Sequence, residues 1–334
     1  MIKNLFHWLF SVWTAVFLAL LYGIVAFFAF RYPAWKSFFG LMTVAYVFLV
    51  PLVLGCMTVF FGEWRARRSW WFRIFMPWAP VGLLALLSLV FAWEGAICVL
   101  MVLPSFLIMA SLGGVLYGLT RDLRGTRLNA VLVGSVLVLP FLGAPLEHRL
   151  DTPSDYREVA TSIEIAAAAD EVWPEIVEVR RFRPEEHRFA WVHAIGFPRP
   201  VAATLSRPGV GGVRRATFEG GVTFFETVDR WEPGRALAFS IASDPDSIPQ
   251  TTLDEHVTVG GPFFDVLRGS YEIEPLAPGR VRLRLVSRYR LTTPFNFYSS
   301  VWTDFVMRDV QNYILAILRR RTEGRGDARS ALPQ

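Results

Sequence analysis

Residues 280–291 have the sequence RVRLRLVSRYRL, in which apolar and arginine side chains alternate. Successive side chains of a β-strand point to opposite faces of its sheet. One face therefore carries Val281, Leu283, Leu285, Ser287, Tyr289 and Leu291. The other face carries Arg280, Arg282, Arg284, Arg288 and Arg290. We predict a strand with one buried face and one solvated arginine ladder that discourages edge-to-edge association. Anion binding by the ladder is the less common alternative.

The segment after this strand predicts a long amphipathic helix. Thr293 is suited to the N-cap and Pro294 to the first turn. Apolar residues then recur at spacings of three and four and form one face over about five turns. These residues are Trp302, Val306, Val310, Tyr313 and Ile317. Residues 322–334 are polar, and we predict a disordered tail there.

The residues before this strand predict an antiparallel meander. A first strand is expected over residues 159–166 and a short helix over 170–179, with Asp170 as its N-cap. Further strands are expected over residues 212–219, 222–231, 236–242, 251–259 and 265–275, leading to the strand at 280–291. Glycine-containing turns at 219–221 and 278–280 separate consecutive strands, as in β-hairpins.

This order of elements resembles the helix-grip fold of the START/polyketide-cyclase-like (SRPBCC) superfamily. Three stretches carry the resemblance. They are Ser162-Ile-Glu-Ile-Ala166 leading into Asp170-Glu-Val-Trp173, then Phe225-Glu-Thr-Val-Asp-Arg-Trp-Glu-Pro-Gly234 before Leu237-Ala-Phe239, and finally the last strand with its helix. The resemblance covers residues 158–321 and implies a cavity between a curved sheet and the C-terminal helix, usually holding an apolar ligand. The superfamily has no shared catalytic motif, and its members include lipid carriers, hormone receptors, cyclases and chaperone cofactors.

The first 147 residues are of a different kind and predict an α-helical membrane domain. Spanning a bilayer takes about 20 mostly apolar residues. Five stretches without Asp, Glu, Lys or Arg satisfy this: residues 6–30, 38–61, 74–93, 96–119 and 128–146. A short polar linker at 148–157 joins them to the α+β domain.

The loops between these stretches predict an orientation. Residues 62–73 contain four arginines and residues 120–127 contain three, and an excess of basic residues marks cytoplasmic loops. With five spans, the N-terminus is then cytoplasmic and the C-terminal domain lies outside, in the periplasm of a bacterium with two membranes. This assignment depends on the number of spans.

Two stripes of small residues occur within the spans. Ala15, Ala19 and Gly23 form one, and Ala110, Gly114 and Gly118 form the other. Small residues at four-residue spacing let membrane helices approach closely. Packing inside the bundle is the simpler interpretation, and docking of a membrane-protein partner is the alternative.

Charge and composition exclude several classes of function. Residues 1–150 contain 11 Lys and Arg against 4 Asp and Glu, whereas residues 151–334 contain 23 against 25. The C-terminal half therefore lacks the basic excess that nucleic-acid binding requires. Both cysteines lie in predicted spans, so this half has no disulfide. His187, His193 and His256 lack the spacing of metal ligands, and no cofactor fingerprint occurs. We predict no metal and no cofactor.

Six residues are candidates to line a ligand cavity. Glu226 shares a face with Val222, Phe224 and Val228, and a buried carboxylate is costly unless it is paired, neutral or bound to a ligand. A structural partner such as an arginine or a tyrosine is the simpler explanation. His256 is a weaker candidate, since on a strand only Asp254 would share its face. Tyr271, Tyr289, Trp302 and Phe305 would line an apolar pocket, although a packed core uses the same residue types.

The sequence favours a membrane-anchored binding module for a lipid or another apolar small molecule at the membrane surface. One alternative is an accessory subunit that docks to a membrane partner. The other is a cyclase- or hydrolase-type enzyme that uses Glu226, with His256 as the second acid–base group, because such chemistry needs two titratable groups at one substrate. The absence of a recognisable catalytic set favours a protein that is not an enzyme.

Overall fold

A computed structural model describes residues 2–35, 38–62, 69–123, 126–243, 256 and 258–330. The chain divides into two compact units. The helical unit comprises Met1–Pro153 and Thr293–Phe295, and the sheet unit comprises Ser154–Thr292 and Asn296–Gln334. Each unit is described separately below.

The helical unit is built from apolar helices. Its described elements are α1 (Ile2–Arg31), η1 (Pro33–Trp35), η2 (Ala45–Leu49), α2 (Val50–Phe61), α3 (Trp70–Phe75), α4 (Trp78–Val90), α5 (Ala96–Leu123) and α6 (Thr126–Glu147). Three helical stretches are long and apolar enough to cross a membrane: Val12–Arg31, Trp70–Val90 and Ala96–Asp122. Two shorter apolar stretches, Ala45–Phe61 and Val133–Glu147, coincide with the second and fifth predicted spans. These helices indicate association with a membrane.

The second stretch begins later than the sequence predicts and has an unusual first turn. Its helix starts near residue 45 with a π-helical segment rather than at residue 38. The carboxylate of Glu147, at the end of α6, accepts hydrogen bonds from the backbone N–H groups of Val44 (2.7 Å) and Ala45 (3.1 Å). Unpaired N–H groups at a helix start need such acceptors. Glu147 therefore joins the start of this helix to the end of α6.

The two stripes of small residues are buried inside the helical unit. Ala15, Ala19 and Ala110 are fully buried. A Cβ atom on Gly114 would lie 2.3 Å from the backbone oxygen of Arg73, and one on Gly118 would lie 2.4 Å from the Arg73 side chain. The stripes therefore pack within the unit, in agreement with the simpler interpretation, and these contacts do not favour the alternative of a docking face. Small residues allow this packing because their side chains do not clash where two helix backbones approach closely.

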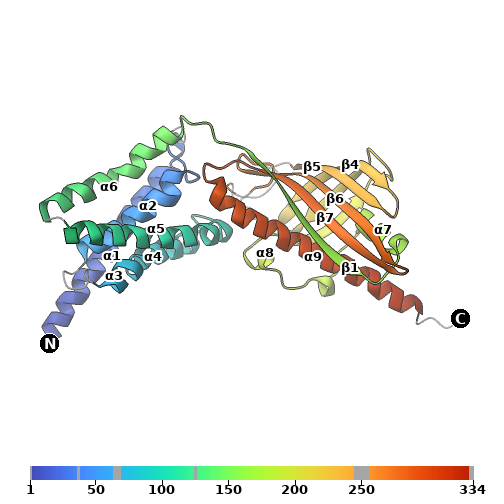
Figure 1. The fold of residues 1–334 in the computed structure, drawn as a ribbon, viewed down its shortest axis with the longest axis horizontal. Helices are drawn as coiled ribbons and strands as arrows, with labels where there is room; N and C mark the ends of the chain where they lie inside the picture. Colours follow the sequence, from blue (N-terminus) through green and yellow to red (C-terminus); the bar gives the residue numbers. More distant parts are fainter. Residues whose placement is uncertain are drawn as a thin grey trace. The chain divides into compact units, whose positions relative to one another are not determined.

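The sheet unit contains one antiparallel sheet of seven strands in the order β1-β7-β6-β5-β4-β3-β2 (Figure 1). The strands are β1 (Asp155–Ile165), β2 (Pro200–Leu205), β3 (Val213–Phe218), β4 (Thr223–Glu232), β5 (Ala236–Ser243), β6 (Phe264–Ala277) and β7 (Arg280–Leu291). Strands β2 to β7 form a meander, and β1 adds beside β7. An antiparallel meander is therefore confirmed, but β5 pairs directly with β6, so the predicted order in which a strand at 251–259 separates them is wrong.

Several details of the sheet unit differ from the sequence predictions. Strand β2 was not predicted, because prolines and loop residues precede it. The predicted strand over residues 251–259 lies mostly outside the described residues. Helix α7 (Ala169–Val177) begins one residue early, so Asp170 lies in its first turn, and the Glu171 carboxylate accepts the Ala168 N–H at 3.0 Å. Acidic groups still occupy the positive end of the helix dipole.

Two short elements, η4 (Pro184–Glu186) and α8 (Trp191–Ala194), precede β2, and the turn η5 (Glu219–Gly221) joins β3 to β4. The long helix α9 (Asn296–Ser330) starts three residues after Thr293 and continues past Thr322, where the sequence predicted a tail. It packs along β1 and β7 and also contacts α7 and α8 (Figure 1). A curled antiparallel sheet with one long C-terminal helix fits a helix-grip fold.

The faces of the sheet follow the predicted alternation. On β7, Val281, Leu283, Leu285, Ser287, Tyr289 and Leu291 are all buried, whereas Arg280, Arg284 and Arg288 are exposed. We call the face toward α9 the inner face and the opposite face the outer face. The core of the sheet unit lies between the inner face and α9.

Candidate functional site

A charged pair is buried on the inner face, where β3, β4 and β6 contribute one polar side chain each. Taken over the whole residue, backbone included, Arg214, Glu226 and Tyr271 are 6%, 7% and 4% exposed. Arg214 and Glu226 are direct partners in the β3–β4 register, and the guanidinium donates a hydrogen bond to the Glu226 carboxylate. We call these three residues the inner polar cluster.

Aromatic and backbone groups complete the surroundings of Arg214. Its Nε donates to the Val177 carbonyl oxygen at 3.2 Å, and its guanidinium lies 5.6 Å from the centre of the Phe239 ring. Tyr271 packs near the same ring, with centroids 6.3 Å apart. A cation over an aromatic face is stabilised more strongly when it is desolvated. The cluster thus has an apolar wall beside its charges.

Gly269 makes room for this wall. It is the β6 partner of Phe239, and a Cβ at that position would lie 2.6 Å from the Phe239 ring. The ring can lie flat across the neighbouring strand only because glycine has no side chain. The sequence offers no local sign of this role.

Burial decides the protonation properties of the cluster. Burial raises the pKa of Glu226, and the charge and hydrogen bond of Arg214 oppose that rise. Burial also raises the pKa of Tyr271, again against the influence of Arg214. A buried ion pair is weak evidence for stability, because desolvation of both ions offsets their attraction. Stabilisation of the fold therefore does not by itself explain the buried Arg214–Glu226 pair.

Another polar side chain on the inner face, that of Ser243, has no hydrogen-bond partner among the described residues. Ser243, at the end of β5, has a buried hydroxyl without a hydrogen bond to any described group. It lies opposite Phe224, two residues from Ile241, which is the register partner of Glu226. Buried hydroxyls in native proteins are nearly always hydrogen-bonded. An unpaired one beside a charged cluster is a place where a ligand atom would be the missing partner.

Tyr289 belongs to a different group. Its hydroxyl donates to the Asp304 carboxylate, and Arg157 binds both Asp304 (2.8 Å) and the Tyr289 oxygen (3.2 Å). Burial favours a higher pKa for Asp304, but the hydrogen bonds from Arg157 and Tyr289 outweigh it and leave the pKa lowered. These contacts connect β1 and β7 to α9, so the group is explained by packing of the helix.

Gln311 connects the same elements further along the helix. Its side chain donates to the Val159 carbonyl (3.1 Å) and to the Ser287 hydroxyl (2.9 Å), and it forms a 3.0 Å hydrogen bond with Thr161. A fully satisfied buried network of this kind fixes a single packing arrangement.

The remaining predicted site residues lie elsewhere. His256 is in a turn rather than on a strand, beside the ring of Phe263. The alternation that would put it on one face with Asp254 therefore does not apply, and Asp254 lies outside the described residues. Trp302 is half-buried on α9, and Phe305 is 43% exposed and packs edge-on against it. Phe305 does not line a closed core in this structure.

Two residues of interest were not predicted. Arg214 had a signal in the sequence, because the turn at Gly220 and Gly221 places residue 214 opposite residue 226.

His193 had no signal in the sequence that pointed to its surroundings. Its Nδ1 bonds the Phe197 carbonyl at 3.0 Å, its buried Nε2 lacks a partner among the described groups, and its ring packs on Tyr313. Burial lowers the pKa of His193. Within the described part of the sheet unit alone, no three metal-ligating side chains converge.

Comparisons with known proteins give structural matches only. No family model and no curated protein matches the chain. A START superfamily protein from Mycobacterium smegmatis covers 50% of this chain and 97% of its own, at 13% identity and a TM-score of 0.34. The Zhui aromatase/cyclase from Streptomyces sp. R1128 covers 50% and 96%, at 18% identity and a TM-score of 0.32. Norcoclaurine synthase from Thalictrum flavum covers 51% and 96%, at 12% identity and a TM-score of 0.31.

Proposed function

We propose that this protein is a membrane-anchored binding module for a lipid or another apolar small molecule, held on the inner face of the sheet. The observation that carries the proposal is the inner polar cluster together with the nearby buried Ser243 hydroxyl, which has no partner among the described residues. Small-molecule sites are mostly apolar surfaces with a few placed polar groups. The inner face has this composition.

The elements around the cluster suit a molecule with an apolar body and one polar end. Phe239, Phe224 and Val228 supply apolar surface on β4 and β5 next to Glu226. The hydroxyl of Ser243 would bond the polar end, and Arg214 and Tyr271 would hold the carboxylate of Glu226 in place. Helix α9 covers the same face along β1 and β7, at the opposite edge of the sheet from β3 and β4. The ligand would therefore lie over β3 to β6.

The helical unit would anchor this module in a membrane. Three helices are long and apolar enough to cross it, and two shorter ones coincide with the remaining predicted spans. We propose five spans, with the arginine-rich loops at 62–73 and 120–127 in the cytoplasm. The sheet unit would then be extracytoplasmic, in the periplasm of a bacterium with two membranes.

The alternatives have less support. An enzyme with Glu226 and His256 as acid and base needs both groups at one substrate, and His256 lies in a turn, off the strands that carry the cluster. A docking subunit that uses the small-residue stripes is disfavoured because those residues are buried in the helical unit. We therefore favour binding over catalysis.

Native mass spectrometry of the full-length protein, released from detergent micelles, tests the proposal. We expect one class of apolar molecule to stay bound to the wild-type protein at about one per chain, and to be lost from Glu226→Gln and Ser243→Ala. Glu232→Gln is the matched control, since that carboxylate lies on the same strand and is paired with Arg230 in an exposed position. A wild-type protein without a retained molecule, or equal retention by all variants, would contradict the proposal.

A further inference from the structure

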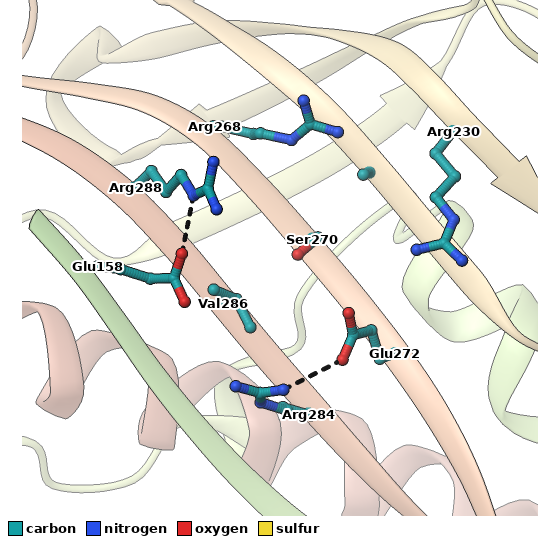
Figure 2. A pocket seen from close by; sticks show the side chains of 9 residues that line it. Glu158, Arg230, Arg268, Ser270, Glu272, Arg284, Val286 and Arg288 are labelled. Carbon is teal, nitrogen blue, oxygen red and sulfur yellow. Dashed lines mark hydrogen bonds and ion pairs between the residues drawn. The ribbon is translucent and has the colours of Figure 1, made fainter.

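The outer face of the sheet contains a hollow of about 380 Å³ over β5, β6 and β7, with β1 and β4 at its sides (Figure 2). Its floor is a row of short side chains: Ala238 pairs with Ser270, and Ser270 with Val286. The neighbouring rows on either side carry long charged side chains. The hollow therefore follows from the strand register, which aligns three short residues across three strands.

Arginines dominate the rim of this hollow. Arg230, Arg268, Arg284 and Arg288 line it, against only two carboxylates, Glu158 and Glu272 (Figure 2). The carboxylates that pair with Arg268 and Arg230 are Asp229 and Glu232. Neither of these two lines the hollow. Arginines therefore outnumber carboxylates among the lining residues, although each of the four is paired with a carboxylate inside or beside the hollow.

Two of these arginines are direct neighbours across the sheet. Arg268 and Arg288 are register partners on β6 and β7, and like charges in directly opposite positions repel. Arg268 bonds Asp229 on β4 at 2.9 Å, while Arg288 bonds Glu158 on β1 at 2.7 Å. The carboxylate partners of the two guanidinium groups therefore come from strands on opposite sides, β4 and β1. An anion above Ser270 would lie between the two groups and interact with both.

Contacts among the described residues engage only some of the donors of these guanidinium groups. A guanidinium has five N–H donors. Arg268 and Arg288 each use one nitrogen in the bonds described above, and Arg284 uses one in a 3.4 Å bond to Glu272. The side chains of Arg268 and Arg284 are 47% and 49% exposed, and that of Arg288 is 66% exposed. Exposed ion pairs of this kind are weak and rearrange at little cost, so an anion can recruit them without unfolding the sheet.

We propose that this outer hollow binds a phosphate-type anion, with Arg268, Arg284 and Arg288 as its ligands and the Ser270 hydroxyl as a donor from the floor. Paired guanidinium forks match the geometry of phosphate oxygens. The chemistry is shared by free phosphate and by the phosphate of a lipid headgroup. The hollow is separate from the inner face, so this site does not depend on the proposed function.

The test uses the full-length protein in nanodiscs of zwitterionic lipid, titrated calorimetrically with inorganic phosphate and with a water-soluble short-chain phosphatidic acid. We expect saturable binding, weakened by about tenfold or more in Arg268→Gln and in Arg288→Gln, because each removes charge-assisted hydrogen bonds. Tighter binding of the short-chain lipid would assign the site to a headgroup, and equal binding would assign it to free phosphate.

Arg280→Gln is the matched control, because Arg280 lies on the same strand and face, pairs with Glu164 at 2.8 Å, and does not line the hollow. Its affinity should stay within about twofold of the wild type. Unsaturable binding of both probes through the millimolar range would overturn the proposal. So would an equal loss in Arg280→Gln, since this would indicate a general effect of surface charge. Far-UV circular dichroism verifies that each variant is folded.

Discussion

The two faces of one sheet use the same pair of residue types in opposite surroundings. On the inner face, the Arg214 and Glu226 side chains are 7% and 10% exposed. On the outer face, Arg284 and Glu272 are 49% and 44% exposed. Both pairs link register partners on neighbouring strands. The comparison shows that the location of an ion pair, rather than its composition, determines what it contributes.

The physical reason is the response of water. Exposed charges are solvated in either state and contribute little when paired. Buried charges lose their hydration, so removing one partner leaves the other uncompensated in a medium of low dielectric. The inner pair should therefore be sensitive to substitution and insensitive to salt, and the outer pairs should show the reverse.

Removing the inner arginine should produce the largest effect. Arg214→Met leaves the Glu226 carboxylate buried without its partner, and we expect a loss of about 3–5 kcal/mol in the free energy of unfolding. Urea unfolding of the full-length protein in micelles, followed by far-UV circular dichroism, measures it. Arg215→Met, the next residue on the same strand and exposed, is the control and should change stability by less than about 1 kcal/mol. Equal losses in both variants would contradict the comparison.

Replacing both members of the inner pair separates burial from pairing. The double variant Arg214→Met/Glu226→Leu should be more stable than Arg214→Met alone, because no buried charge remains. A double variant less stable than the single one would mean that the unpaired Glu226 carboxylate is not the cause of the loss in Arg214→Met. The same variant should lose the bound molecule expected for the inner face.

Gly269→Ala should have an intermediate effect. The added methyl group would meet the Phe239 ring at 2.6 Å, and such overpacking costs about 1–3 kcal/mol. The displaced ring would also move away from Arg214. Ser270→Ala is the control, because Ser270 is the next residue on β6 but faces outward, so its substitution leaves the contact with Phe239 unchanged. If both variants unfold at the same urea concentration, the close approach of Phe239 is not important for stability.

The dependence of stability on pH should differ in sign between two acids. Glu226 has a raised pKa in the folded protein. At pH values above its unfolded pKa of about 4.3, the folded state therefore binds more protons than the unfolded state. The free energy of unfolding should fall as the pH rises from that value through the folded pKa. Asp304 has a lowered pKa, so its contribution is present above about 3.9 and disappears as pH falls through the folded value. Unfolding free energies measured from acid to neutral pH should lose the first slope in Glu226→Gln and the second in Asp304→Asn. Unchanged profiles would show that neither acid is perturbed.

The smallest effect is expected on the outer face. Glu272→Gln should change the free energy of unfolding by less than about 1 kcal/mol, and added salt should reduce the difference further because exposed charges are screened. Measurement at low and high salt distinguishes this from Arg214→Met, whose effect should persist in salt. A large effect of Glu272→Gln that is independent of salt would contradict the assignment of this pair to a solvated face.

Several features of the fold were predictable from the sequence for local reasons. The alternation in residues 280–291 correctly predicted the buried and exposed faces of β7, because strand geometry requires it. The meander and the long last helix followed from turn residues and from apolar spacing. Strand β2 was missed, since Pro200–Leu205 is short and its alternation weak. The first turn of α7 was misplaced by one residue, within the usual range for helix ends.

The candidate site was only partly predictable. The sequence indicated that Glu226 is buried, but its partner Arg214 depends on the strand register, which places residues twelve positions apart side by side. The role of Gly269 depends on a neighbouring strand, and the position of His256 depends on a loop. Each of these involves contacts between residues that are distant along the chain.

The sequence by itself determined the apolar helices and the two faces of the strand at 280–291, because hydropathy and backbone periodicity are local properties. Only the tertiary structure decided which side chains meet. It paired Glu226 with Arg214, buried the small-residue stripes, and aligned Ala238, Ser270 and Val286 beneath a rim of arginines. These outcomes depend on register and on packing, which arise when distant segments come together and exclude water.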